Sequence, residues 1–142
     1  MIIVKIRTFI RWLLLQPYFI LLTKIYKMNI SKTARVSLGA KLDKTYPKGI
    51  YIDDDSYIAS GAIIFTHDFS RTLYKDTIIG KRCFIGANAI IMAGVKIGDE
   101  VIIGSGALVT KDVPSNCVAA GNPAKILKTG IKTTKYGKLI NE

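Results

Sequence analysis

The sequence has few cysteines, few histidines and few acidic residues for its length. Among 142 residues there are two cysteines and one histidine, and the 21 lysines and arginines outnumber the ten aspartates and glutamates. Cys83 and Cys117 have neither the spacing of a disulfide framework nor that of a zinc site, so no metal is expected. The default expectation is a reduced, cytoplasmic compartment.

A long apolar run is also absent. The run from Trp12 to Leu22 is interrupted by Gln16 and Pro17 and is shorter than the roughly 20 residues that span a bilayer. Basic residues precede it, as in a signal peptide, but no small-residue cleavage motif follows. We predict an N-terminal helical segment, residues 1–28, made of two short helices that break near Pro17.

Two interpretations of this segment stay open. It packs on its own domain or a neighbouring subunit, or it lies weakly on a membrane surface, held by apolar contacts and cationic side chains. The second would place the protein at the inner face of the membrane.

The formal charge of +11 favours anionic partners, namely phosphate-bearing cofactors, nucleic acid or an acidic membrane. No nucleic-acid recognition motif is present, so we expect no nucleic-acid partner. A chain of this length, half of it hydrophobic, suffices for one domain with its own core.

A six-residue period dominates the chain from residue 79 onward. Aliphatic residues recur in one register at Ile79, Ile85, Ile91, Ile97, Ile103 and Val109. Small or β-branched residues follow each of them by four positions, at Cys83, Ala89, Val95, Val101, Ala107 and Val113. An α-helix cannot keep a six-residue spacing on one face. Short strands separated by turns can, so the period predicts a parallel β-helix.

Glycine directly follows four of the aliphatic positions, and we expect it to relieve backbone strain at the turns. The residue before each aliphatic should point outward. If each coil has three sides, Phe84 stacks with Ile102 and Ile90 with Leu108, and such apolar strips favour subunit contact unless loops or the N-terminal segment cover them.

The register slips twice, between Leu42 and Ile52 and between Ile64 and Ile79. Inserted residues in a solenoid form external loops, and the second loop, residues 65–78, holds the only histidine. We expect a β-helix domain over residues 29–121 and a basic C-terminal tail over residues 122–142, with the turn at Asn122-Pro123 letting the tail fold back.

The histidine loop, the repeats and the ending Gly121-Asn-Pro-Ala-Lys125 together resemble the hexapeptide-repeat acyltransferases, over about residues 50–128. These include galactoside, maltose and nodulation-factor acetyltransferases and O-acetyltransferases of capsular and lipopolysaccharide sugars. The resemblance implies an all-β fold, a left-handed parallel β-helix with a short N-terminal helical segment, and a homotrimer. It also implies acetyl-CoA, with no metal, in a groove between subunits.

The resemblance further implies His67 as the catalytic residue. It implies cofactor contacts from Ala87, Ser105, Thr110, Lys111, Lys125 and Lys128. The family often has arginine at the last two positions; lysine keeps the charge but loses bidentate geometry. Lys125 and Lys128 would share one side if that segment were helical.

Acetyl transfer to a hydroxyl needs a general base, and neutral imidazole suits that role. We expect Asp68 to be a loop or acceptor-pocket residue. The acidic cluster at residues 53–55 is a solvated turn, or one of its carboxylates binds acceptor hydroxyls or orients His67. A backbone N–H near Gly86 or Ala87 would stabilise the oxyanion.

The sequence therefore predicts acetyl transfer from acetyl-CoA to a sugar hydroxyl of a cell-surface polysaccharide or its precursor. N-acetylation of an amino sugar, acetylation of a xenobiotic, and a non-catalytic β-helix binding module remain alternatives. A zinc carbonic anhydrase of similar fold is disfavoured, because such enzymes need several histidine ligands.

Overall fold

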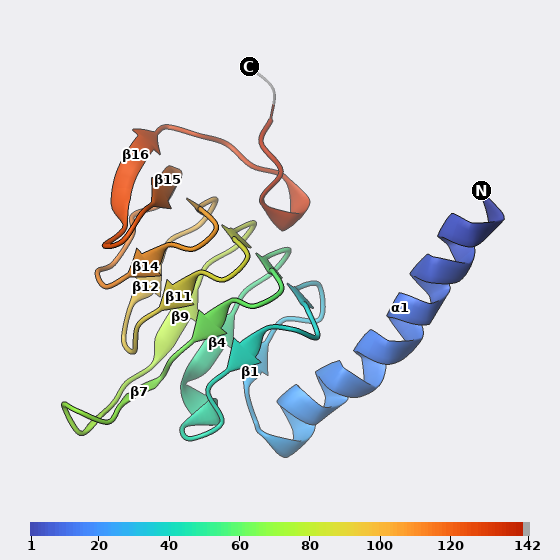
Figure 1. Cartoon of the computed structure of the whole chain (residues 1–142), viewed down its shortest axis with the longest axis horizontal. Coiled ribbons are helices and arrows are strands. Elements are labelled where there is room, and N and C mark those ends of the chain that lie inside the picture. The colour runs from blue at the N-terminus through green and yellow to red at the C-terminus, as the bar shows by residue number, and fades with distance from the viewer. Residues whose placement is uncertain (141–142) are drawn as a thin grey trace.

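A computed structural model describes residues 1–140 and shows a three-sided solenoid of short parallel strands (Figure 1). Sheet A contains β1 (Asn29–Ile30), β4 (Ile50–Ile52), β9 (Thr77–Ile79) and β12 (Lys96–Ile97). Sheet B contains β2 (Arg35–Val36), β5 (Tyr57–Ile58), β10 (Phe84–Ile85), β13 (Ile102–Ile103), β15 (Cys117–Ala120) and the antiparallel β16 (Lys125–Thr129). Sheet C contains β3 (Lys41–Leu42), β6 (Ile63–Ile64), β11 (Ile90–Ile91) and β14 (Leu108–Val109). The parallel β-helix predicted from the six-residue period is confirmed.

The core is three columns of aliphatic side chains, one column inside each sheet. Members of one column occupy equivalent places in successive coils, as the pairing of Ile58 with Ile85 and of Ile85 with Ile103 shows. None is more than 2% exposed: Ile52, Ile79 and Ile97; Ile58, Ile85 and Ile103; Ile64, Ile91 and Val109. Burying each such side chain stabilises the fold by about 1.5–3 kcal/mol.

The repeat glycines serve a different purpose from the predicted one. Gly80, Gly86, Gly98 and Gly104 do not have the positive φ of a strained turn. A Cβ on Gly86 would instead lie 2.6 Å from the backbone nitrogen of Ser105 in the next coil. These positions need glycine because successive coils touch there. Left-handed conformations occur at other turns. Between sheets A and B they recur, at φ 51–63°, at Asp55, Arg82, Glu100 and Asn116.

The N-terminal segment forms one helix instead of two. Helix α1 (Ile2–Ile20) contains Pro17 and continues into a π-helical turn, η1 (Leu21–Ile25). Proline removes one backbone hydrogen bond, but Pro17 and Leu13 are exposed, so water can reach the freed carbonyl. Leu22 and Met28 are buried and cap the first coil. Among residues 1–140, no helix combines the length and apolarity needed to cross a bilayer.

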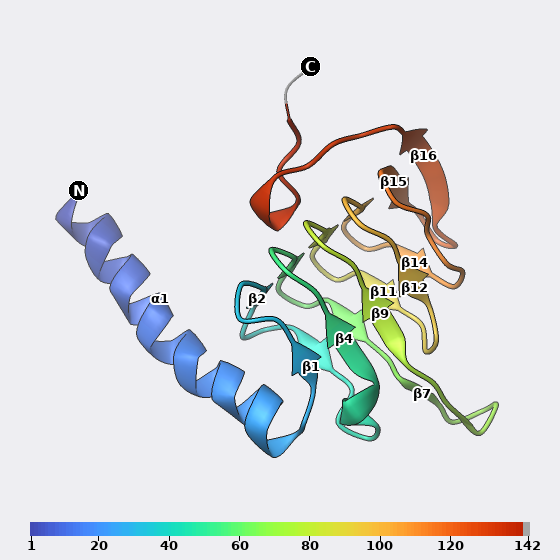
Figure 2. The same ribbon diagram turned by 180° about the vertical axis from the view of Figure 1, so that it is seen from behind.

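The C-terminal tail runs back along the edge between sheets A and B (Figure 2). Its residues donate hydrogen bonds to backbone carbonyls of successively earlier coils. The Ile131 N–H donates to the Asn116 carbonyl at 3.1 Å, and the Thr133 hydroxyl donates to the Arg82 carbonyl at 2.6 Å. The Tyr136 N–H donates to the Asp55 carbonyl at 2.7 Å. A 3-10 turn, η3 (Lys135–Gly137), ends this contact. The tail therefore braces coils that lie far apart in the sequence.

The outward apolar residues stack as predicted, Phe84 with Ile102 and Ile90 with Leu108. The tail covers part of the strip on sheet B, because a Cβ on buried Gly137 would lie 2.5 Å from the Phe84 Cβ. The strip on sheet C, formed by Ile63, Ile90 and Leu108, stays partly exposed.

Candidate active site

Both insertions leave the solenoid at the same edge, between sheet C and sheet A. The first, residues 43–49, ends in a 3-10 turn, η2 (Pro47–Gly49). The second, residues 65–76, carries a projecting hairpin of β7 (His67–Asp68) and β8 (Leu73–Tyr74) (Figure 1). The predicted external loops are confirmed, and the two lie on neighbouring coils.

The contact between these loops is an Asp–His pair. His67 Nδ1 lies 2.5 Å from Asp43 Oδ2, and the two side chains are 26% and 3% exposed. A carboxylate can only accept, so Nδ1 carries the proton, and in the neutral ring the lone pair is on Nε2. The pair therefore presents a partly accessible imidazole in the tautomer that a general base requires.

Asp43 is itself held by the backbone of both loops. Its Oδ2 accepts hydrogen bonds from the N–H groups of Thr66 and His67 at 2.9 and 3.0 Å, and its Oδ1 accepts one from Thr45 at 2.9 Å. Burial by itself raises the pKa of Asp43, but these hydrogen bonds and the one from the His67 ring together hold the pKa below its ordinary value of 3.8. The carboxylate thus stays charged and fixed in place.

Aromatic rings surround the histidine. Its ring stacks on Tyr74 with centroids 6.4 Å apart, and Phe65 meets it edge-on at 6.2 Å. Tyr46 packs against Tyr74 and donates a hydrogen bond from its hydroxyl to Asp76 at 3.0 Å, which raises the pKa of the phenol. The imidazole is therefore packed between aromatic rings as well as bonded to Asp43.

Asp43 is the site residue that the sequence interpretation missed. The signal was available, since Asp43 opens the first register slip just as the second slip leads to His67. The acidic cluster of residues 53–55 does not orient His67. It lies at the edge between sheets A and B, where Asp54 accepts a hydrogen bond from the Ser31 hydroxyl.

Asp68 is a loop residue, as expected. It accepts hydrogen bonds from the Ser70 hydroxyl and from Arg71 Nε, each at 2.7 Å. The Ser70 bond and then the Arg71 contacts lower the pKa of Asp68 to about 2. These bonds stabilise the hairpin turn, and none of them involves His67.

The predicted cofactor residues fall into three groups. Ala87 and Ser105 lie on adjacent coils at the edge between sheets B and C, where Gly106 N–H bonds the Ala87 carbonyl at 2.8 Å. Thr110 and Lys111 follow β14 at the edge that carries His67, two coils further on. Lys125 and Lys128 are exposed on β16, paired with Ala120 and Val118.

Two details of the predicted donor site change. The segment with Lys125 and Lys128 is a strand, so helical spacing does not place them on one side. Gly86 N–H already donates to the Ile103 carbonyl at 2.9 Å, so it is not a free oxyanion donor. Within residues 1–140, no group of three His, Cys, Asp or Glu side chains could hold a metal ion.

Comparison with known proteins agrees with this architecture. Residues 76–111 match the family model described as bacterial transferase hexapeptide (six repeats). A putative acetyltransferase of Bacillus subtilis, YvoF, is 33% identical over 105 residues, which are 72% of this chain and 61% of the relative. The chain thus spans less than two thirds of that relative's length.

Two solved structures are similar as well. The maltose O-acetyltransferase of Clostridium difficile superposes with a TM-score of 0.59 at 28% identity, over 71% of this chain and 68% of that one. The polySia-specific acetyltransferase NeuO superposes with a TM-score of 0.50 at 30% identity, over 77% of this chain and 53% of that one. The fold is therefore the left-handed parallel β-helix. Residues 76–111 thus carry the hexapeptide repeat of the bacterial transferases, and the proteins that the chain resembles here are acetyltransferases.

Proposed function

We propose that this protein transfers an acetyl group from acetyl-CoA to a sugar hydroxyl of a cell-surface polysaccharide or its precursor. The observation that carries the proposal is the Asp43–His67 pair on the hairpin that interrupts the repeat. Fold alone would not identify an enzyme. A buried carboxylate that orients a partly exposed imidazole is the arrangement of a general base.

The proposed chemistry uses Nε2 of His67. It takes the proton of the acceptor hydroxyl as the oxygen attacks the thioester carbonyl that acetyl-CoA supplies. The new C–O bond forms, the C–S bond breaks, and the imidazolium returns its proton to the departing thiolate. Asp43 stabilises the imidazolium in between and prevents the ring from rotating.

The donor would lie along the edge between sheets B and C. Small residues there, Ala87 and Ser105, leave room for a slender chain. Thr110 and Lys111 follow Ser105 on the last full coil. Lys125 and Lys128 supply positive charge for phosphates. These residues lie at several edges of one solenoid, so one chain alone does not bring all of them to His67.

We therefore propose a homotrimer in which neighbouring subunits complete each site. The partly exposed strip of Ile63, Ile90 and Leu108 on sheet C is an apolar surface suited to such contact. Light scattering at micromolar concentration should give three times the chain mass; a stable monomer would contradict the assembly. We also propose a cytoplasmic location, which is supported by the two free cysteines, Cys83 and Cys117.

The sugar acceptor is supported by the names of the relatives, which include a maltose and a polySia acetyltransferase. The test is an acceptor screen with acetyl-CoA that reads free thiol release. It should compare neutral sugars and glycan fragments with matched amino sugars and with chloramphenicol. Turnover on hydroxyl acceptors, absent without acceptor, supports the proposal. Turnover restricted to amines would replace it with N-acetylation.

A further inference from the structure

Helix α1 is the longest element that buries no side chain among residues 1–140. None of its residues is buried, and both views show it leaning away from the solenoid, attached only at its C-terminal end (Figures 1 and 2). A solitary helix so rich in apolar residues needs a second surface, because helices in water are stabilised chiefly by packing an apolar face.

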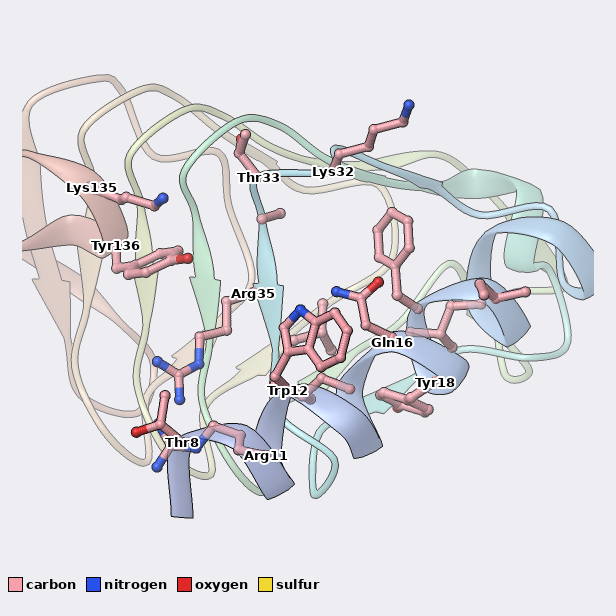
Figure 3. Close-up of a pocket in the computed structure, with 16 residues that line it drawn as sticks. Thr8, Arg11, Trp12, Gln16, Tyr18, Lys32, Thr33, Arg35, Lys135 and Tyr136 are labelled. Carbon is pink, nitrogen blue, oxygen red and sulfur yellow. The ribbon is translucent and has the colours of Figure 1, made fainter. Parts of the chain in front are cut away.

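The side of α1 that faces its own domain carries both polar and apolar side chains. Thr8, Arg11 and Gln16, together with Trp12, line a cavity of about 740 Å³ (Figure 3). Its opposite wall includes Arg35 of β2 and Tyr136 of the tail. Leu15 and Phe19 line the cavity as well, so α1 turns only part of its apolar surface toward its own domain.

The opposite side of α1 is apolar throughout. At 100° per residue, the positions turned away from the cavity form what we call the outward face. Its large side chains are 49–74% exposed: Ile2, Ile6, Phe9, Ile10 and Leu13. The same helical spacing places Lys5 at one border of this face and Arg7 and Arg11 at the other.

Charge distinguishes between the possible partners of the outward face. Residues 1–42 contain eight of the 21 basic residues and none of the ten acidic ones. Contact with a second copy would bring like charges together: α1 would meet α1, or the apolar strip of sheet C, which continues into exposed Lys41. An anionic bilayer accepts apolar side chains and attracts cations at the same time.

We infer that α1 lies on an anionic lipid surface, with its outward face in the bilayer interface and its border cations at the headgroups. Arg and Lys at such borders extend their aliphatic stems along the apolar layer and keep the charge in water. The inference is independent of the acetyl-transfer proposal, since it rests on α1 and uses no site residue.

The test is co-sedimentation of the full chain with vesicles of phosphatidylcholine alone or with one quarter phosphatidylglycerol. We expect binding to the anionic vesicles, at least tenfold weaker binding to neutral ones, and loss as salt rises from 50 to 500 mM. Equal binding to both vesicle types, or binding to neither, overturns the inference.

Two matched variants locate the contact. Ile6→Ser/Ile10→Ser/Leu13→Ser removes three aliphatic side chains from the outward face. Leu38→Ser/Leu127→Ser/Leu139→Ser removes three of similar exposure elsewhere. We expect the first to lose at least tenfold in vesicle binding and the second to bind as wild type, with unchanged circular dichroism in both. Equal losses would mean non-specific adhesion.

A third measurement excludes the rival occupant. If the outward face packed on a second copy, the first variant would have a smaller mass by light scattering without lipid. An unchanged mass supports the lipid surface, and a fall to monomer would overturn it.

Discussion

The first two coils and the last two coils are built on the same repeat but differ in regularity. Residues 77–109 follow the six-residue step without interruption, and their inward side chains are almost fully buried. Residues 29–76 break the step twice, at the same edge, and the breaks bring Asp43 to His67. The regular half supplies rigidity, and the interrupted half supplies the polar groups that a solenoid core has no room for.

The sharpest way to separate the two halves is His67→Ala. We expect kcat to fall at least 100-fold, because a general base contributes about 10² to 10⁴-fold. Affinity for CoA should hardly change, since the base acts in the transition state. Thiol-release kinetics and calorimetric titration with CoA check this. Retained activity would remove His67 from the mechanism.

In the regular half, Ile91→Ala should lower the stability of the protein and leave its kcat nearly unchanged. Ile91 is 0% exposed, and its truncation should lower the free energy of unfolding by about 2–5 kcal/mol. The kcat of the folded fraction should stay near wild type. Denaturant titration beside kinetics measures both, and Ile91→Val, which loses about 0.5–1.5 kcal/mol, is the control. A large kcat loss with unchanged stability would break the proposed division.

Asp43→Asn tests whether the first insertion serves the second. We expect kcat to fall about 10- to 100-fold, a typical effect of losing a partner that orients a functional side chain. The KM for acetyl-CoA should stay unchanged. Asp53→Asn, at another edge, is the matched control and should be neutral. Equal effects of both would mean a general influence of charge.

The same variant also tests the linkage of Asp43 to pH. Its pKa is lowered on folding, so its charged form stabilises the protein above the ordinary value of 3.8. This contribution is lost as pH falls through the lower folded value. The wild type should therefore melt above Asp43→Asn at pH 5–7, with the gap closing below about pH 3.8. A constant gap would contradict the lowered pKa.

The smallest expected effect belongs to the tail. Replacing Lys125 and Lys128 by Ala should raise the KM for acetyl-CoA about tenfold, at about 1 kcal/mol for each partly exposed phosphate contact. The kcat should be nearly kept. A truncated donor without the nucleotide should show a much smaller change. If both donors suffered equally, the lysines would support the fold or the assembly.

Much of the fold could be predicted from local pattern. A period of six is incompatible with a helix, so Ile79 to Val109 identified the solenoid, and the slips after Leu42 and Ile64 identified both external loops. Local rules failed at Pro17, where the exposed position let α1 continue, and at Gly86, whose role is contact with the next coil instead of backbone strain.

The sequence by itself determined the repeat, the inward columns and the histidine on a loop, because each depends on the identity and spacing of neighbouring residues. Only the tertiary structure decided the partner of that histidine. Asp43 and His67 are 24 positions apart, and they meet because one full coil of the solenoid returns the chain to the same edge. The orientation of α1 was likewise decided in three dimensions. Its apolar spacing does not say which side faces the solenoid, and the packing of Leu22 and Met28 against the first coil sets that.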